Sequence, residues 1–242
     1  MGNQFRGSRF INTEIKMKLI IFILGILLLN YAEALVVTGK AYSENKIIYV
    51  EKHFPIVLKD GSYQSLKTEY FFDNGKKFAD ISSDFSLNQF VPNVIFKDER
   101  FNLLEYIKWD RASNMLLIER EINNKKKSSS LEIKSASILG QGFHNFIVKN
   151  FDNILKSEVD VYFIITSKSD QFHFKMYLAK KTDKEVIIKG KIDNFFLRAF
   201  VEEIELTYAL PDKRLLRFKG LSNLDNNQGN SQNVDILYEY EN

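Results

Sequence analysis

Three polar side chains at two-residue spacing have the chemistry of an acid–base relay. Tyr49, Glu51 and His53 occupy positions i, i+2 and i+4, so in a β-strand their side chains project from one face. A phenol, a carboxylate and an imidazole in a row can pass a proton along a strand. The same alternation is typical of a strand whose polar face meets solvent, and this simpler interpretation is the one that we favour. Glu51 and His53 are nevertheless candidate binding residues.

Charged residues also interrupt apolar strand faces further along the chain. A strand over 94–100 would place Asp98 and Arg100 on a face with apolar side chains. On the next strand Glu105 would be flanked by large apolar residues, where a carboxylate has to be paired or protonated. We predict a buried salt bridge between Arg100 and Glu105, with Asp98 as a further member. The alternative is that the three form a polar site on the floor of a cavity.

Metal and cofactor chemistry lacks its usual sequence signals. The chain has no cysteine, which excludes disulfides, thiol catalysis and cysteine-bound metals. His144 and His173 are isolated, with no spacing typical of a metal site. Glycine-rich phosphate loops, Gly-x-Ser-x-Gly and His-Glu-x-x-His are all missing from the sequence. We therefore expect no metal, no cofactor and no assigned catalytic residue.

The charge balance argues against nucleic acid as a partner. The 242 residues carry 34 Lys and Arg against 31 Asp and Glu, which gives a formal net charge of +3. Residues 1–34 hold four of the basic and two of the acidic side chains, so without them the net charge falls by two, to about +1. A nucleic-acid-binding domain needs a basic stripe for phosphate contacts, and none is present.

Residues 1–34 have the three parts of a secretory signal. A basic start precedes the apolar run Leu19–Leu29, and Ala32-Glu33-Ala34 supplies the small residues of a cleavage site before Leu35. The run is shorter than the roughly 20 residues that cross a bilayer, so we expect no stable membrane span after cleavage. An uncleaved anchor that recruits the following residues is the alternative, and Met17 is an alternative start. The expected location is the periplasm, with the extracellular space as the alternative.

The remainder, residues 35–242, has the pattern of a single β-rich domain. Segments of β-branched and aromatic residues recur about every 10 to 14 residues and are separated by turn-forming residues. In Gln171–Leu178, for example, apolar residues alternate with more polar ones. We expect roughly eleven to thirteen strands, joined by short turns into a mainly β, antiparallel meander.

One segment has the spacing of a helix instead of a strand. Phe143, Ile147 and Phe151 repeat every four residues, so 143–156 is predicted to form one central amphipathic helix. A single helix in a long meander has to cover an apolar surface, which favours a strongly curved sheet, a half-barrel or a barrel. These three side chains are candidates to line an apolar cavity between the helix and the sheet.

Several segments together resemble an uncharacterised family of exported bacterial proteins. They are Gly39-Lys-Ala-Tyr42, Ile48-Tyr49-x-Glu51-x-His53, Phe96-x-Asp98-x-Arg100, Glu105, Gly220-Leu-Ser-Asn223 and Val234-x-Ile236-x-Tyr238. The resemblance covers the chain after the signal segment and implies export, without an activity. At the level of layout alone, the sequence is also similar to periplasmic carriers of lipids and lipoproteins.

Three classes of function follow from these patterns. The first is a non-enzymatic envelope protein that binds a lipid or another apolar or amphipathic small molecule in a half-barrel cavity. The second is an interaction or structural module of the envelope. The third is an enzyme that uses the polar cluster. An apolar cavity of several hundred cubic ångströms beneath the helix would favour the first, and a solid core there would favour the second. The identity of the ligand and the oligomeric state stay open.

Overall fold

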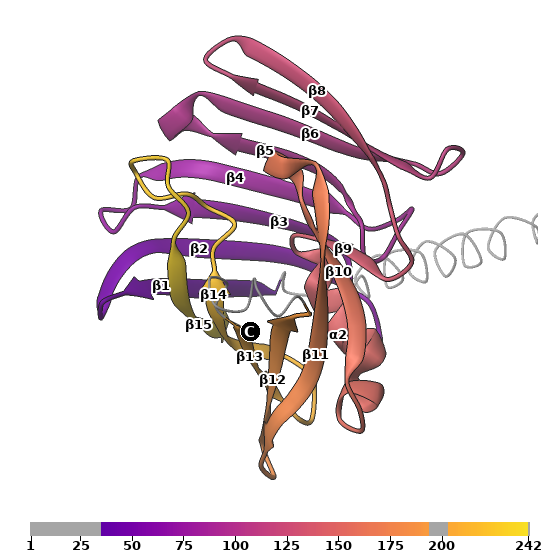
Figure 1. Cartoon of the computed structure of the whole chain (residues 1–242). Helices are drawn as coiled ribbons and strands as arrows, with labels where there is room; N and C mark the ends of the chain where they lie inside the picture. Colours follow the sequence, from indigo (N-terminus) through magenta and orange to yellow (C-terminus); the bar gives the residue numbers. More distant parts are fainter. Residues whose placement is uncertain (1–34, 194–202, 242) are drawn as a thin grey trace, which may run out of the picture. The chain divides into compact units, whose positions relative to one another are not determined.

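A computed structural model describes residues 35–193 and 203–241 and contains one helix and a large β-sheet there (Figure 1). The strands are β1 (Val36–Ser43), β2 (Lys46–Val57), β3 (Tyr63–Phe71), β4 (Lys77–Asp84), β5 (Asn93–Asp98), β6 (Leu103–Asp110), β7 (Met115–Ile122), β8 (Lys125–Glu132), β9 (Ser137–Leu139), β10 (Val159–Ile165), β11 (Asp170–Lys181), β12 (Glu185–Ile192), β13 (Ile204–Ala209), β14 (Leu215–Leu221) and β15 (Asn233–Glu241). The helix is α2 (Gly142–Ile154), and short 3-10 turns are η1 (Glu99–Phe101) and η2 (Thr166–Lys168). The predicted mainly β fold is confirmed.

All fifteen described strands belong to one open sheet. Its order is β8-β7-β6-β5-β4-β3-β2-β1-β15-β14-β13-β12-β11-β10-β9. Every neighbouring pair is antiparallel except β9 and β10, which are parallel and are joined through α2. The sheet is not closed, so the barrel alternative is not realised. The strand count exceeds the expected range because β8 and β9 lack the apolar alternation that marks the others.

The two edge strands are consecutive in the chain, which forces the sheet to curl. Only residues 133–136 separate β8 from β9, and a linker of that length spans at most roughly 18 Å. Hydrogen bonds join β8 to the turn between β10 and β11 and to the start of β11, beside the short edge strand β9. The Gln171 side-chain amide donates to the Glu132 carbonyl at 2.8 Å, and the hydroxyls of Ser129 and Ser169 lie 2.6 Å apart. We call this junction between the two edges the seam.

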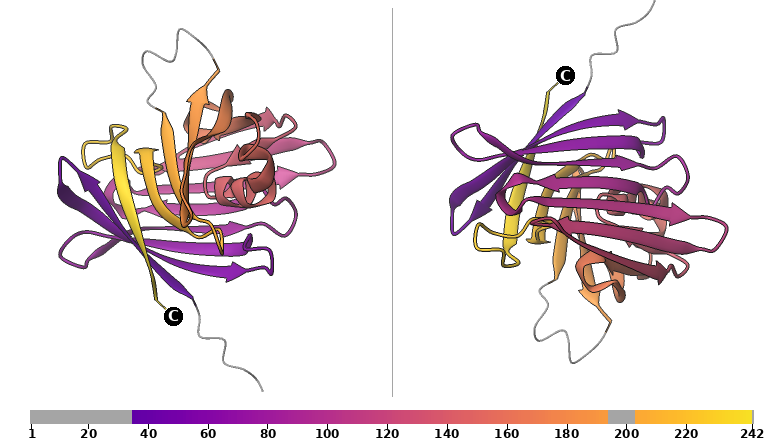
Figure 2. Two further views of the ribbon diagram at one scale, coloured as in Figure 1. Left: turned by 90° about the horizontal axis from the view of Figure 1, so that it is seen from below. Right: turned by 90° about the horizontal axis from the view of Figure 1, so that it is seen from above.

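The curled sheet places its two halves face to face, and α2 packs against strands of the second half. Figure 2 shows β10–β14 and α2 lying over one face of the β2–β8 half. Two apolar clusters fill the interior. One belongs mainly to the first half and includes Tyr70, Ile107 and Leu116. The other joins α2 to β10–β14 and includes Ile147 and Ile188, both fully buried.

Helix α2 begins at a glycine that touches another loop. The predicted helix over 143–156 is observed at Gly142–Ile154. The segment before it is fixed to the loop after β4, because the Leu139 amide donates to the Phe90 carbonyl at 3.0 Å. A Cβ atom on Gly142 would lie 2.0 Å from that same carbonyl oxygen. Only a residue without a side chain fits at this contact.

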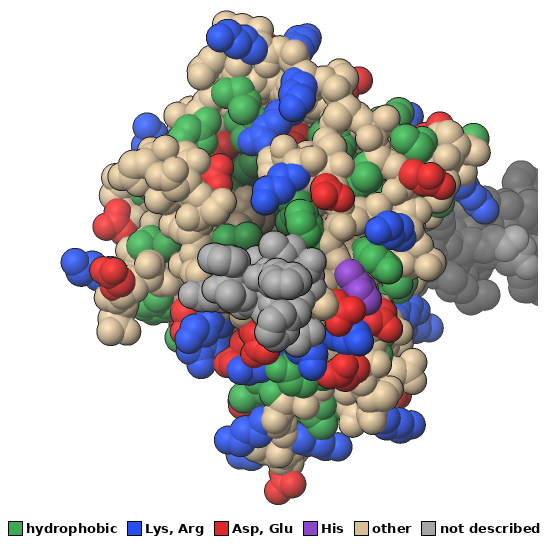
Figure 3. Space-filling view, viewed as in Figure 1, with side chains coloured by type: hydrophobic (Ala, Val, Ile, Leu, Met, Phe, Trp, Pro, Cys, Tyr) green, Lys and Arg blue, Asp and Glu red, His purple; other side chains and the backbone are tan. Residues whose placement is uncertain are grey.

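The outer surface mixes charges of both signs. On the face shown in Figure 3, Lys and Arg side chains are interspersed with Asp and Glu side chains. Within the described ranges, no helix has the length and apolar character needed to cross a membrane. Nor do three metal-ligating side chains of His, Asp or Glu gather at any point of residues 35–193 and 203–241.

The buried His144 connects α2 to both halves of the sheet. Its ring stacks between Tyr63, at 4.2 Å between ring centroids, and Tyr208, at 5.8 Å. One ring nitrogen lies 3.1 Å from the Gly61 carbonyl oxygen and the other 3.2 Å from the Tyr208 hydroxyl. Burial lowers the pKa of His144 from 6.5 to about 4.

This lowered pKa predicts an acid sensitivity of folding. Between pH 6.5 and about 4 the unfolded chain binds a proton at His144 that the folded chain does not, so stability falls as pH decreases. From pH 7 to pH 5 we expect His144 to contribute a loss of about 2 kcal/mol in the free energy of unfolding. Urea unfolding of wild type and His144→Gln at both pH values measures it. An equal pH dependence in the two proteins would contradict the prediction.

Candidate functional site

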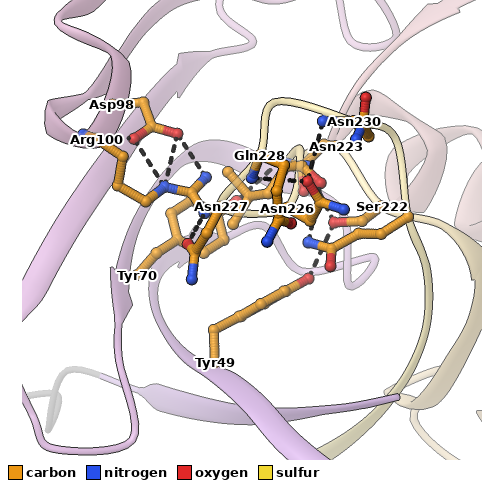
Figure 4. Close-up of polar contacts among 12 residues, drawn as sticks. Tyr49, Tyr70, Asp98, Arg100, Ser222, Asn223, Asn226, Asn227, Gln228 and Asn230 are labelled. Carbon is orange, nitrogen blue, oxygen red and sulfur yellow. Dashed lines mark hydrogen bonds and ion pairs between the residues drawn. The ribbon is translucent and has the colours of Figure 1, made fainter. Parts of the chain in front are cut away.

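Arg100 lies in the turn that follows β5, where a carboxylate and two aromatic rings hold it. The Asp98 carboxylate accepts from the Arg100 backbone N–H at 3.0 Å, from Nε at 3.0 Å and from Nη2 at 2.6 Å (Figure 4). The guanidinium carbon lies 4.3 Å from the centroid of the Phe78 ring and 5.0 Å from that of Phe101. Asp98 is 2% exposed. The guanidinium is therefore fixed, and its charge is balanced by a buried partner.

The predicted salt bridge between Arg100 and Glu105 is wrong. Strand β5 ends at Asp98, and Arg100 lies in η1, so it no longer follows the alternation of the strand. The register places Glu105 opposite Phe96 on one side and Arg120 on the other. The partner of the Arg100 guanidinium is instead Asp98, which lies only two residues away in the sequence. The expectation that Asp98 takes part in a buried ion pair agrees with this geometry.

Glu105 instead forms an incomplete ion pair near the seam. Its Oε1 lies 3.9 Å from Nη1 of Arg120, and its Oε2 accepts from the Thr166 hydroxyl at 3.3 Å. Glu105 Oε1 and Arg120 Nε are both buried, and neither has a hydrogen-bond partner within the described residues. Burial raises the pKa of Glu105, and the nearby Arg120 only partly opposes the rise. The prediction that this carboxylate is either paired or protonated is therefore only partly confirmed, because one oxygen has a hydrogen bond and the other has none.

A pocket of about 200 Å³ opens beside Arg100. Its walls come from β2, the turn after β3, β4, η1 and the loop 222–232 between β14 and β15. The lining residues are Ile48, Tyr49, Phe72, Phe78, Arg100, Asn226, Asn227, Gln228 and Gln232. One side of this space, which we call the Arg100 pocket, is apolar and aromatic, and the other side carries amides and the guanidinium.

The loop 222–232 is tied to the sheet at several points. The hydroxyls of Tyr49 and Ser222 lie 3.1 Å apart, and the Asn223 amide donates to the Tyr70 hydroxyl at 2.9 Å (Figure 4). Leu224 is 1% exposed and is part of the first apolar cluster. These anchors hold the outer residues of the loop over the pocket, where Asn227 accepts from Arg100 Nη1 at 3.2 Å.

Unused hydrogen-bonding groups remain at the pocket. Three of the five N–H bonds of Arg100 have acceptors in the described part of the chain, which leaves two for a ligand. Among the same residues, the Asn227 side-chain NH₂ and the Gln228 side chain have no partner, and Gln232 uses only its NH₂, toward the Leu224 carbonyl. The pocket thus offers donors and acceptors together, next to flat apolar rings.

The favoured solvent-facing interpretation of Tyr49, Glu51 and His53 is wrong. Tyr49 is 2% exposed and Glu51 is 3% exposed, and both point into the curled sheet. Glu51 lies opposite Gly39 on β1, where a Cβ atom would approach within 2.7 Å of the Glu51 Cγ atom. The glycine therefore makes room for the carboxylate. Burial first, and then the Glu51 carboxylate, raise the pKa of the Tyr238 hydroxyl.

Glu51 begins a buried chain of hydrogen bonds that ends at α2. Its Oε1 lies 2.9 Å from Nε2 of His53, whose Nδ1 lies 2.7 Å from the Thr68 hydroxyl. Thr68 accepts from the Gln141 amide at 2.6 Å, and the Gln141 carbonyl oxygen accepts from the Ser83 hydroxyl at 2.9 Å. The relay of Tyr49, Glu51 and His53, which was the alternative to the solvent-facing interpretation, is present only in part. The Glu51 carboxylate contacts His53, but His53 continues to Thr68, and the Tyr49 hydroxyl contacts Ser222 instead.

This hydrogen-bonded series contains the residue types of a catalytic triad, but a substrate has no access to it. Thr68 is fully buried, so a substrate cannot reach its hydroxyl. Its oxygen is already engaged by His53 and Gln141. In the described residues, neither Glu51 nor His53 is paired with Arg100 or Glu105, so the two polar groups form separate clusters. The arrangement joins β2, β3 and β4 to the start of α2 and thereby stabilises the curl.

The three candidate residues of the helix lie in a packed interior. Ile147 is fully buried and Phe151 is 3% exposed, and both belong to the cluster that joins α2 to the sheet. Phe143 is half-buried and lies 6.1 Å from the Phe218 ring. Neither the Arg100 pocket nor the larger cavity described below is lined by residues of α2. A ligand site beneath the helix gains no support.

No function was expected of loop 222–232 from its sequence, because its polar residues belong to the turn-forming segments between strands. A signal was present in its composition. Seven amide side chains fall within 223–233: Asn223, Asn226, Asn227, Gln228, Asn230, Gln232 and Asn233. Amides favour turns, but so many in one connection also provide donors and acceptors for a ligand.

Comparison with known proteins adds little to this description. No protein-family model matches the chain, and no curated protein is significantly similar to it in sequence. Among solved structures, the chain is similar to a porin-like protein from Bacteroides uniformis ATCC 8492, with 7% identity and a TM-score of 0.25. The alignment covers 86% of this chain and 96% of that chain. A likeness this weak carries no argument, and the resemblance to exported proteins stays a prediction.

Proposed function

We propose that this protein is a non-enzymatic binding protein of the bacterial envelope that holds one small, neutral, amphipathic ligand in the Arg100 pocket. The observation that carries the proposal is the two-sided lining of the pocket. Aromatic rings form one wall, and unused amide groups with two free guanidinium N–H bonds form the other. Binding sites typically combine an apolar surface with a few fixed polar groups in this way.

The charge of the site favours a neutral ligand. The buried Asp98 carboxylate balances Arg100, so an anion would meet little net positive charge. Amide side chains are uncharged, and each offers a donor and an acceptor. Hydroxyl groups have the same dual character, and the face of a saccharide ring is apolar enough to pack on the partly exposed Phe72 ring. A single sugar ring therefore fits the chemistry of the pocket.

The size of the site favours a small ligand. A volume of about 200 Å³ is below the roughly 300–1,000 Å³ of sites that enclose drug-sized molecules. The pocket would therefore take one ring, or the end of a longer molecule, and leave the remainder in solvent. Asn227 and Gln228 are exposed at its rim, where an incoming ligand meets them first.

Export is part of the same proposal. Residues 1–34 lie outside the described residues, so the support comes from their sequence pattern. An apolar run is followed by a small-residue cleavage site before Leu35, and the first strand begins at Val36, one residue later. Cleavage at that site would leave β1 intact.

Calorimetric titration with N-acetylglucosamine and with methyl glucoside tests the binding proposal. We expect a single sugar ring to bind at one site with a dissociation constant near the millimolar range. The double variant Asn227→Ala and Gln228→Ala removes two neutral hydrogen-bonding groups, each worth about 0.5–1.5 kcal/mol, and should weaken binding about tenfold. The sugar should be recovered chemically unchanged.

A matched control lies on the same loop. The Asn230 side chain does not line the pocket, so Asn230→Ala should bind each sugar as wild type does. Equal affinities for wild type and the double variant, or no heat from either sugar at tens of millimolar, would refute the proposal.

A further inference from the structure

A second and larger cavity lies at the seam of the sheet. Its volume is about 350 Å³, and its walls come from the loop after β4, the end of β6 and the passage between β8 and β9. The apolar part of the lining includes Phe90, Val91, Trp109 and Ile133. It shares no lining residue with the Arg100 pocket, so nothing here depends on the function proposed above.

Trp109 contributes its ring to the wall of the seam cavity. Its indole N–H is enclosed by protein atoms and has no acceptor within the described residues, although the Trp109 backbone N–H donates to the Asn93 side chain at 3.0 Å. Because this N–H has no accessible surface, a ligand in the cavity meets the ring and not the donor.

Lys134 supplies positive charge at the same cavity. It is the one charged residue among those that line the space within the described residues. Its ammonium lies 4.6 Å from the centroid of the Tyr162 ring and has no carboxylate partner in residues 35–193 and 203–241. Unlike Arg100, this cation is not balanced, so its field is available to an anion.

From the apolar lining and the unbalanced charge of Lys134 we infer that the seam cavity binds an amphipathic monoanion with a short alkyl chain. The alkyl chain packs against Phe90, Val91 and Ile133, and the carboxylate is attracted by Lys134. The volume falls within the range of small-molecule sites. A neutral alcohol of equal length lacks the charge, and an alkylammonium carries the wrong one.

Trp109 is the single tryptophan of the chain, so its fluorescence reports on this cavity. We expect sodium octanoate to change the emission of the protein with a saturable, one-site curve. Octan-1-ol should bind at least about fivefold more weakly, and octylammonium should not bind. In Lys134→Gln the octanoate affinity should fall about five- to tenfold, while the octanol affinity stays unchanged.

A control variant keeps the test decisive. Lys126, 80% exposed on β8, is absent from the cavity lining, so Lys126→Gln should bind octanoate like wild type. The inference is overturned if octanoate leaves the emission unchanged, if Lys134→Gln binds it as tightly as wild type, or if octylammonium binds equally well.

Discussion

Gly142→Ala is expected to destabilise the fold by more than about 3 kcal/mol, because the new methyl group has no space. Its carbon would lie 2.0 Å from the Phe90 carbonyl oxygen and 2.8 Å from the carbonyl carbon. These are backbone atoms, so no side-chain rotation relieves the clash. Either the first turn of α2 or the loop after β4 has to move, and the loop is fixed through the hydrogen bond from Leu139. Urea unfolding measures the loss.

Gly140→Ala is the matched control for this clash. The added methyl group at Gly140 meets nothing within 4 Å, and the cost arises only from the positive φ of +47°. That cost is about 1–2 kcal/mol. If the two alanine variants unfold at the same urea concentration, the close contact between Gly142 and Phe90 does not exist in solution.

Arg100→Ala is the second substitution with a large expected effect, about 3–5 kcal/mol of lost stability. The substitution leaves the Asp98 carboxylate, with a side chain only 3% exposed, without its cation. It also removes the packing on Phe78. The double variant Asp98→Asn and Arg100→Ala has no buried, unpaired carboxylate, so it should be more stable than Arg100→Ala alone. Chemical denaturation of the three proteins at pH 7 gives both differences.

An exposed arginine pair provides the contrast. Arg217 forms a two-point contact with Asp235, but the side chains are 40% and 30% exposed. Arg217→Ala should therefore cost under about 1 kcal/mol. A cost for Arg100→Ala as small as that for Arg217→Ala would show that Asp98 is not buried by the fold.

Local periodicity was sufficient to predict most of the strands and the helix. In Gln171–Leu178, side chains of alternating type occupy a single strand, and the four-residue spacing from Phe143 gave the helix to within two residues. These are local periodicities, which a chain carries in its own sequence. The two edge strands were not predictable, because β8 pairs with β7 and β9 pairs with β10 through backbone hydrogen bonds without an alternating apolar pattern.

Alternation does not show which face of a strand is inside, and this explains the wrong interpretation of Glu51. Its burial depends on residues distant in the sequence. His53 lies beside it, but Tyr238 and the glycine that makes room for it belong to other strands. A carboxylate among polar neighbours on one strand is therefore compatible with either face until the partners are known.

The partner of Arg100 could not be predicted from the sequence either, since it depends on where β5 ends. Had the strand continued to residue 100, the guanidinium would have stayed on the face shared with Phe96. The turn at η1 instead brings Arg100 back onto Asp98 and toward loop 222–232. The candidate pocket thus arises from a turn of three residues and a loop more than a hundred residues further along the chain.

The most direct test of the Arg100 pocket as a ligand site is a ¹H–¹⁵N NMR titration that resolves side-chain amides and the arginine Nε group. Titration with N-acetylglucosamine should shift the side-chain resonances of Asn227, Gln228 and Arg100 Nε in parallel, with one dissociation constant. Resonances of residues at the seam should stay fixed in the same titration. Unchanged pocket resonances at tens of millimolar sugar, or shifts confined to another part of the molecule, would contradict the account.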